Sequence, residues 1–170
     1  MVETNWSEGV QGGAAQPVYV VGGDTNSANA GVPTSETWRV SLQSDVTVDQ
    51  NSKTFTVPAG QEWQVLSAHV AYVSQGTAGD RQLVMEGLDA LGNVIYEARA
   101  GAVQAATLTR YYEFAPGLEP MVAFLDTDFI SVPIAPFFLS ALWQVRFRDN
   151  NNVAVADDIL VQMVIASRQV

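Results

Sequence analysis

The sequence contains no cysteine, a single lysine (Lys53) and a single histidine (His69) among its 170 residues. Without cysteine, the chain cannot form a disulfide framework, an iron–sulfur cluster, a thiolate zinc site or a cysteine nucleophile. One histidine also excludes a histidine-rich metal centre. We therefore expect neither a metal nor another cofactor.

Charged residues make up only 15% of the chain, and acidic residues outnumber basic ones by 18 to 8, which gives a formal net charge of −10. Nucleic-acid binding needs clustered Lys and Arg, and anionic membrane surfaces attract basic segments, so the composition disfavours both partners. No apolar run approaches the length of about 18 residues that indicates a membrane span. The segment Met1–Gly9 lacks the basic and apolar regions of a signal peptide, so we expect synthesis in the cytoplasm without export.

Residues 1–36 differ from the rest of the chain because they are rich in glycine and contain no basic residue. Their one strand-like run comprises Val18, Tyr19, Val20 and Val21. One interpretation is a disordered leader. The other is an extended arm that lies across a neighbouring subunit and pairs these four residues with a foreign sheet edge. The contrast between the apolar run and its flanks favours the arm.

From residue 37 onward the chain alternates between apolar and polar residues with the period of a β-strand. This pattern predicts strands at 37–42, 53–57, 62–74, 81–88, 94–99, 108–114, 129–134, 142–148 and 159–168. The regular spacing and the turn residues Pro58–Gly60 and Gly92–Asn93 are typical of an antiparallel sandwich. We predict one all-β domain over residues 37–170, an antiparallel β-sandwich of the jelly-roll type.

The predicted strand 62–74 is apolar on both faces. Trp63, Val65 and His69 are assigned to one face, and Leu66, Val70 and Tyr72 to the other. A sandwich strand with one face in water should alternate cleanly. The pattern therefore predicts that a second subunit or the arm covers the outer face.

Three glutamates, Glu86, Glu97 and Glu113, lie on predicted central strands and could converge as the carboxylate pair of a glycosidase. The favoured interpretation is a solvated strand face or pairing with Arg81, Arg99 and Arg110. No Gly-x-Ser-x-Gly elbow accompanies His69, which is expected to be a packed or interfacial histidine rather than a catalytic base. We therefore expect no enzyme.

Two acidic pairs are rich enough in oxygen to suggest calcium, namely Asp126 with Asp128 and Asp157 with Asp158. Neither pair has the ligand spacing of a calcium loop, and turn chemistry is the favoured interpretation. Tryptophans on predicted strands could form a sugar-stacking platform, although core packing is the usual role of such residues.

Several segments resemble small jelly-roll proteins of tailed-phage particles. The resemblance begins with the turn and strand Thr56–Gly60 and Glu62–Ser67, and it extends through Arg81–Glu86, Asp89–Val94, Arg99–Ala106, Leu108–Tyr112 and Phe114–Gly117. It covers residues 54–168 and carries over no individual functional residue. The resemblance implies a virion component, a capsid decoration (cement) protein on the capsid exterior that binds the major capsid protein and stabilises the shell.

Under this interpretation we expect a homotrimer that matches the local symmetry of a capsid. The expected interface residues are the large apolar side chains Phe137, Phe138 and Trp143, together with the arm. Three alternatives remain open from the sequence. They are a tail or receptor-binding module that recognises a host glycan, a carbohydrate-binding sandwich outside any virion, and a small hydrolase that uses Glu86 or Glu113.

Overall fold

The computed structural model describes residues 37–125, 128–150 and 156–170. Every regular element in these residues is a strand, which confirms the predicted all-β fold. The strands are β1 (Arg39–Asp45), β2 (Lys53–Thr56), β3 (Gln61–Val73), β4 (Leu83–Leu88), β5 (Val94–Arg99), β6 (Thr109–Ala115), β7 (Phe129–Pro133), β8 (Phe138–Leu139), β9 (Gln144–Asp149) and β10 (Asp158–Gln169). The predicted arm, residues 1–36, lies outside the described residues.

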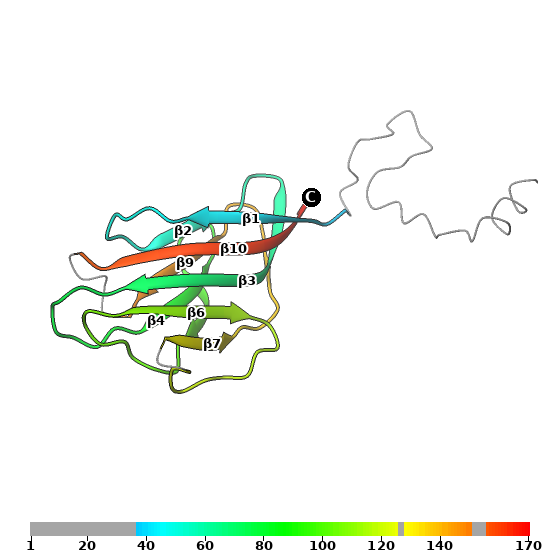
Figure 1. Cartoon of the computed structure of the whole chain (residues 1–170). Helices are drawn as coiled ribbons and strands as arrows, with labels where there is room; N and C mark the ends of the chain where they lie inside the picture. Colours follow the sequence, from blue (N-terminus) through cyan, green and yellow to red (C-terminus); the bar gives the residue numbers. More distant parts are fainter. Residues whose placement is uncertain (1–36, 126–127, 151–155) are drawn as a thin grey trace, which may run out of the picture. The chain divides into compact units, whose positions relative to one another are not determined.

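Two sheets pack face to face around the core (Figure 1). The larger sheet has the order β1-β10-β3-β6-β7, with β8 paired to β3, and the smaller sheet has the order β2-β9-β4-β5. The antiparallel pairs β1–β10, β2–β9, β3–β6 and β4–β5 are nested in the sequence. Nested pairs divided between two sheets form a jelly roll, as predicted.

Glycines close two turns at the predicted places. Gly60, between β2 and β3, has a φ of 73°, and Gly92, between β4 and β5, has a φ of 84°. Both values lie in the left-handed region, which glycine adopts without steric cost. At the second turn, the Asp89 carboxylate accepts hydrogen bonds from the backbone N–H groups of Leu91 and Asn93, each at 2.8 Å.

A β-bulge interrupts the pairing of β3 with β10. Val65 lies opposite Ile165, whereas Ser67 lies opposite Val164, so Leu66 is an extra residue in β3. An extra residue shifts the alternation of side chains by one position. The side chains before and after the bulge therefore face the same core.

The bulge corrects the faces expected for this strand. Its buried apolar residues are Trp63, Val65, Ala68, Val70 and Tyr72, and all five belong to the core cluster. The expectation that His69 shares a face with Trp63 is wrong, because His69 follows the bulge and is exposed. One core thus accounts for the apolar pattern that suggested two covered faces.

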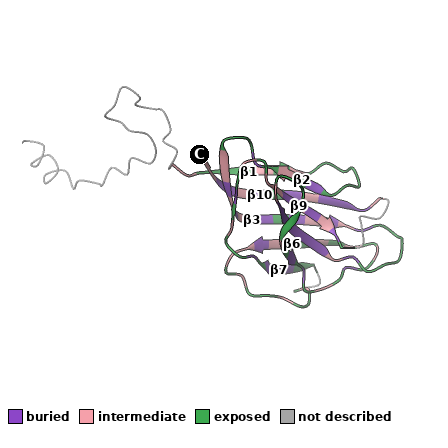
Figure 2. Cartoon of the chain, turned by 180° about the vertical axis from the view of Figure 1, so that it is seen from behind, coloured by how far each residue is buried: buried purple, intermediate pink, exposed green. Residues whose placement is uncertain are grey.

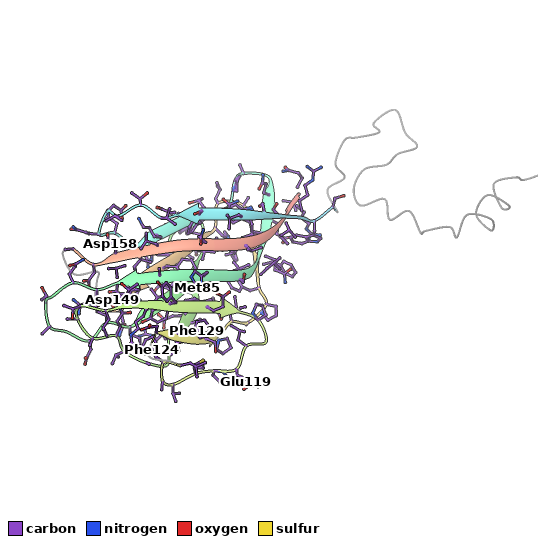
Figure 3. The ribbon with its side chains drawn as sticks, in the orientation of Figure 1. Met85, Glu119, Phe124, Phe129, Asp149 and Asp158 are labelled. Atoms are coloured by element: carbon purple, nitrogen blue, oxygen red, sulfur yellow. The ribbon has the colours of Figure 1, made fainter. Side chains whose placement is uncertain are left out.

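Side chains from both sheets meet in the core. Phe114 of β6 and Phe147 of β9 contact each other edge to face, with ring centroids 5.7 Å apart. Met85 of β4 is fully buried and lies in the middle of the sandwich (Figure 3). Burial of such side chains is the main favourable contribution to folding.

One end of the sandwich is held by a buried ion pair between Arg81 and Asp157. The Arg81 guanidinium also donates to the backbone carbonyl of Thr77 at 2.8 Å, and the Asp157 carboxylate accepts from the N–H of Gln75 at 2.6 Å. The hydrogen bonds that Arg81 donates to the Asp157 carboxylate raise the pKa of Arg81, which keeps the guanidinium charged. The pair therefore joins the loop after β3 to the residue that precedes β10.

We expect Asp157→Ala to lower the free energy of unfolding by about 3–5 kcal/mol, because it leaves the Arg81 charge buried without its carboxylate. Urea unfolding followed by tryptophan fluorescence would measure this loss. The matched control is Glu97→Ala, which removes the partner of the exposed Arg99 and should cost about 1 kcal/mol or less. Equal losses in the two variants would contradict a structural role for the buried pair.

Candidate protein-interaction surface

The two sheets expose outer faces of different chemistry. On the smaller sheet, the Glu86 side chain is only 1% exposed and accepts hydrogen bonds from Arg146 and Arg148, with each arginine Nη2 2.6 Å from a carboxylate oxygen. Burial raises the pKa of Glu86, but the hydrogen bonds from Arg148 and Arg146 outweigh it and hold the pKa below its usual value. The carboxylate is therefore charged, and each of its oxygens has an arginine partner.

The other glutamates do not complete a catalytic pair with it. Glu97 lies opposite Glu86 across the β4–β5 pair, but Arg148 contacts both carboxylates, and Glu97 also pairs with Arg99. Glu113 lies on the larger sheet, 3.2 Å from His69. The expected pairing with Arg99 is confirmed for Glu97, whereas Glu86 pairs with Arg146 and Arg148, which were not among the expected partners.

The outer face of the larger sheet is more apolar. The regular β1–β10 register places Val40 and Leu42 opposite Ala166 and Val164, on the side away from the core residues of β10. Val40 is 69% exposed and Leu42 is 58% exposed. In Figure 2 the colours of burial distinguish β1, which has no buried residue, from β3 and β6.

An aromatic cluster continues this face at the end of β10. The rings of Trp38 and Phe138 lie 5.7 Å apart, and the Arg168 guanidinium stacks 4.8 Å above the Trp38 ring. Glu62 holds Arg168 in place through an ion pair of 2.6 Å. The cluster of Trp38, Phe138 and Arg168 is therefore an ordered, partly apolar surface of the kind that interfaces use as anchors.

A polar strip crosses the same face. His69 contacts Glu113 and stacks on Tyr111, with ring centroids 5.8 Å apart. The His69 side chain is 46% exposed, so the packed alternative is wrong and the interfacial one stays a prediction. Phe129 of β7, labelled in Figure 3, lies opposite Tyr111 in the β6–β7 pair and is also exposed.

The predicted interface aromatics have different environments. Phe138 is 53% exposed, whereas Phe137 and Trp143 are partly buried and pack against the core. Phe137 contacts Tyr96, with ring centroids 4.6 Å apart, and it lies so close to Gly87 that a Cβ there would meet its ring at 3.2 Å. Of the three, Phe138 presents the largest surface to a partner. Val18, Tyr19, Val20 and Val21 lie outside the described residues.

One pocket in the described part of the chain is too small for most ligands. A pocket of about 150 Å³, lined by Arg99, Met121, Ser131 and neighbouring residues, is about half the size at which ligand pockets begin. Residues 37–125, 128–150 and 156–170 contain no group of three side chains suited to a metal ion. Asp157 and Asp158 instead accept hydrogen bonds from the backbone N–H groups of Gln75 and Gln50.

Comparison with protein-family models finds no match, and comparison with curated proteins finds none either. Among solved structures, the chain is similar to one chain in a structure of the infectious bursal disease virus Gx strain. The alignment has a TM-score of 0.30 and 8% identity, and it covers 89% of this chain and 35% of that chain. A likeness at this level carries no argument about function. The described residues contain no helix able to span a membrane.

The first prediction from this surface concerns the neighbouring phenylalanines. We expect Phe138→Ser to change the free energy of unfolding by less than about 1 kcal/mol, because the side chain is half exposed. Phe137→Ser should cost about 2–4 kcal/mol, because it removes a ring packed against Tyr96 and the core. Thermal and urea unfolding would measure both. Equal effects would contradict their different packing.

The second prediction concerns pH. A carboxylate whose pKa is lowered by folding stabilises the protein above its usual pKa, and this contribution disappears as the pH falls through the lowered value. We therefore expect Glu86→Gln to cost about 1–3 kcal/mol near pH 7, because the arginines that lose their partner are partly exposed, and progressively less below the usual pKa of 4.5. Urea titrations of both proteins between pH 7 and 3 would measure the difference, in which the remaining acids cancel. A difference independent of pH would contradict the ionised Glu86.

Proposed function

We propose that the chain is a structural protein of a phage virion, a capsid decoration protein that binds the major capsid protein and stabilises the shell from outside. The observation that carries the proposal is the contrast between the two outer faces. Arginine–glutamate pairs cover the centre of the smaller sheet, whereas the larger sheet leaves Val40, Leu42 and Phe138 exposed on paired strands. Exposed apolar groups on a rigid surface favour protein binding.

The fold supports the same proposal. Residues 54–168, which resemble small phage jelly-roll proteins, form most of a sandwich that has the jelly-roll topology. A clamp on a shell needs a rigid body and an adhesive face, and it acts by binding the assembled state in preference to the dissociated one. Neither requirement involves a cofactor.

The charge supports a position on the outside of the particle. A protein with a formal net charge of −10 is repelled by packaged DNA, which is also negatively charged. Nucleic acid and membranes are accordingly not partners in this proposal. The arm of residues 1–36 remains the expected anchor, and the homotrimer remains a prediction about the copies on the shell.

The experiment that tests this function is the copy number of the protein in purified particles, referenced to the major capsid protein by quantitative mass spectrometry. A copy number comparable to that of the shell subunits is the expected result. A few copies per particle would replace the proposal with the tail or receptor-binding module, and glycan binding would then be measured. Absence from particles would exclude a virion role.

For shells that lack the protein, we expect Phe138→Ser to weaken binding of the added protein about tenfold, because a large apolar anchor is lost at the interface. Leu91→Ser is the control, since Leu91 is also a large apolar residue and is even more exposed, at 88% against 53%, but lies in the turn between β4 and β5. Co-sedimentation with shells would measure both affinities. Equal weakening by both variants would contradict binding through the larger sheet.

A further inference from the structure

Strand β1 forms an edge of the larger sheet. It pairs with β10 on one side, and within the described residues no strand pairs with its other side. The unpaired side of an edge strand presents backbone N–H and C=O groups that can bind another strand. β1 is therefore a possible site for strand addition.

β1 has few of the usual protections of an edge strand. Its charged side chains are confined to its two end residues, Arg39 and Asp45. Its seven residues, Arg-Val-Ser-Leu-Gln-Ser-Asp, include neither proline nor lysine, and its register with β10 continues without a bulge from Arg39 to Asp45. None of its residues is buried. Natural proteins commonly block exposed edges with lysine, proline or bulges, so a regular and open edge calls for an explanation.

Arg39 adds a second observation. Lys53 and the arginines at 81, 99, 110, 146, 148 and 168 all have a carboxylate oxygen within 4.0 Å. Arg39 is the remaining one of the eight basic residues, and in the described part of the chain it forms no ion pair. Acidic residues outnumber basic ones in this chain, yet no carboxylate of the described residues pairs with the guanidinium on the open edge.

We propose that β1 pairs antiparallel with β1 of a second copy of this chain, around a two-fold axis at Leu42. The axis at the middle residue pairs the full length of both strands. It sets Arg39 opposite Asp45 of the second copy, twice per dimer, and Ser41 opposite Gln43. Residues that are opposite each other in an antiparallel pair have Cβ atoms about 4.5–5.5 Å apart, which suits an ion pair.

The Asp45 carboxylate is accessible and charged, as this contact requires. It is 37% exposed and its Oδ1 accepts from the N–H of Thr47 at 3.0 Å, with Lys53 at 3.3 Å. The hydrogen bond from Thr47 outweighs burial and lowers the pKa of Asp45, so the group is charged at neutral pH. On the other face of the strand, Leu42 meets Leu42 of the second copy, so the most central exposed side chain of β1 becomes covered.

Other pairings lose this complementarity. A parallel arrangement sets Arg39 beside Arg39 and Asp45 beside Asp45, which is repulsive. An antiparallel axis at Ser41 or Gln43 sets Arg39 opposite Gln43 or Thr47 instead.

An isologous contact of this kind joins two copies and not three, because each edge pairs with an identical edge. The proposal is independent of capsid binding and differs from the expected homotrimer.

The absence of cysteine makes a sharp test available. In the full chain, Leu42→Cys should form an intermolecular disulfide under mild oxidation, since Cα atoms opposite each other lie within the 4.4–6.8 Å that a disulfide needs. Val40→Cys is the matched control. Its two copies are four residues out of register, about 13 Å apart, and should not be linked. Non-reducing gels of both variants would measure the difference.

Sedimentation equilibrium of the unmodified full chain should show a mass twice 18.3 kDa that declines on dilution. Arg39→Glu should weaken this dimer about tenfold or more, because it replaces two attractive pairs by repulsive ones. A monomer or a trimer at all concentrations would overturn the proposal. Equal cross-linking of the two cysteine variants would also overturn it, as would a dimer unaffected by Arg39→Glu. Copy number in particles tests the proposed function separately.

Discussion

The extra residue at Leu66 lets β3, the middle strand of the larger sheet, turn one face to the core along its whole length. β3 pairs with β10 on one side and with β6 on the other, so its core-facing side chains lie beside those of both neighbours. The bulge lets Trp63 and Tyr72 enter the same core although they stand at positions of opposite parity. Val40 and Leu42 owe their exposure to the unbroken β1–β10 register, and Tyr111 belongs to β6, which pairs with the part of β3 that follows the bulge.

The outer faces of the two sheets differ in chemistry because different side chains cover them. Arg146 and Arg148 of β9 neutralise Glu86 and shield it from water, so the centre of the smaller sheet is polar and its charges are paired. The larger sheet has no comparable set of paired charges over β1, and its apolar residues remain open. The proposed binding role of the larger sheet rests on this asymmetry, whereas the proposed self-pairing rests on the open edge of β1.

Much of the fold could be predicted from the sequence, because alternation and turn residues are local signals. The turn between β4 and β5 contains Gly92 as expected, and the predicted strand 94–99 matches β5. The bulge could not be predicted, since Leu66 is an ordinary strand residue and the register is set by β10, far along the chain. For the same reason, the sequence around Glu86 could not predict its arginine partners, which lie some 60 residues away. The sequence around Arg39 likewise could not predict its place on an edge strand.

The nested pairing has a consequence for how the chain reaches this structure. β10 lies between β1 and β3, so the larger sheet cannot close until Asp158–Gln169 has been synthesised and has inserted between two strands made much earlier. Contacts between residues so distant in sequence form slowly. During translation β1 therefore has both of its edges open, and chaperones would encounter the nascent chain in that state before its last strand arrives.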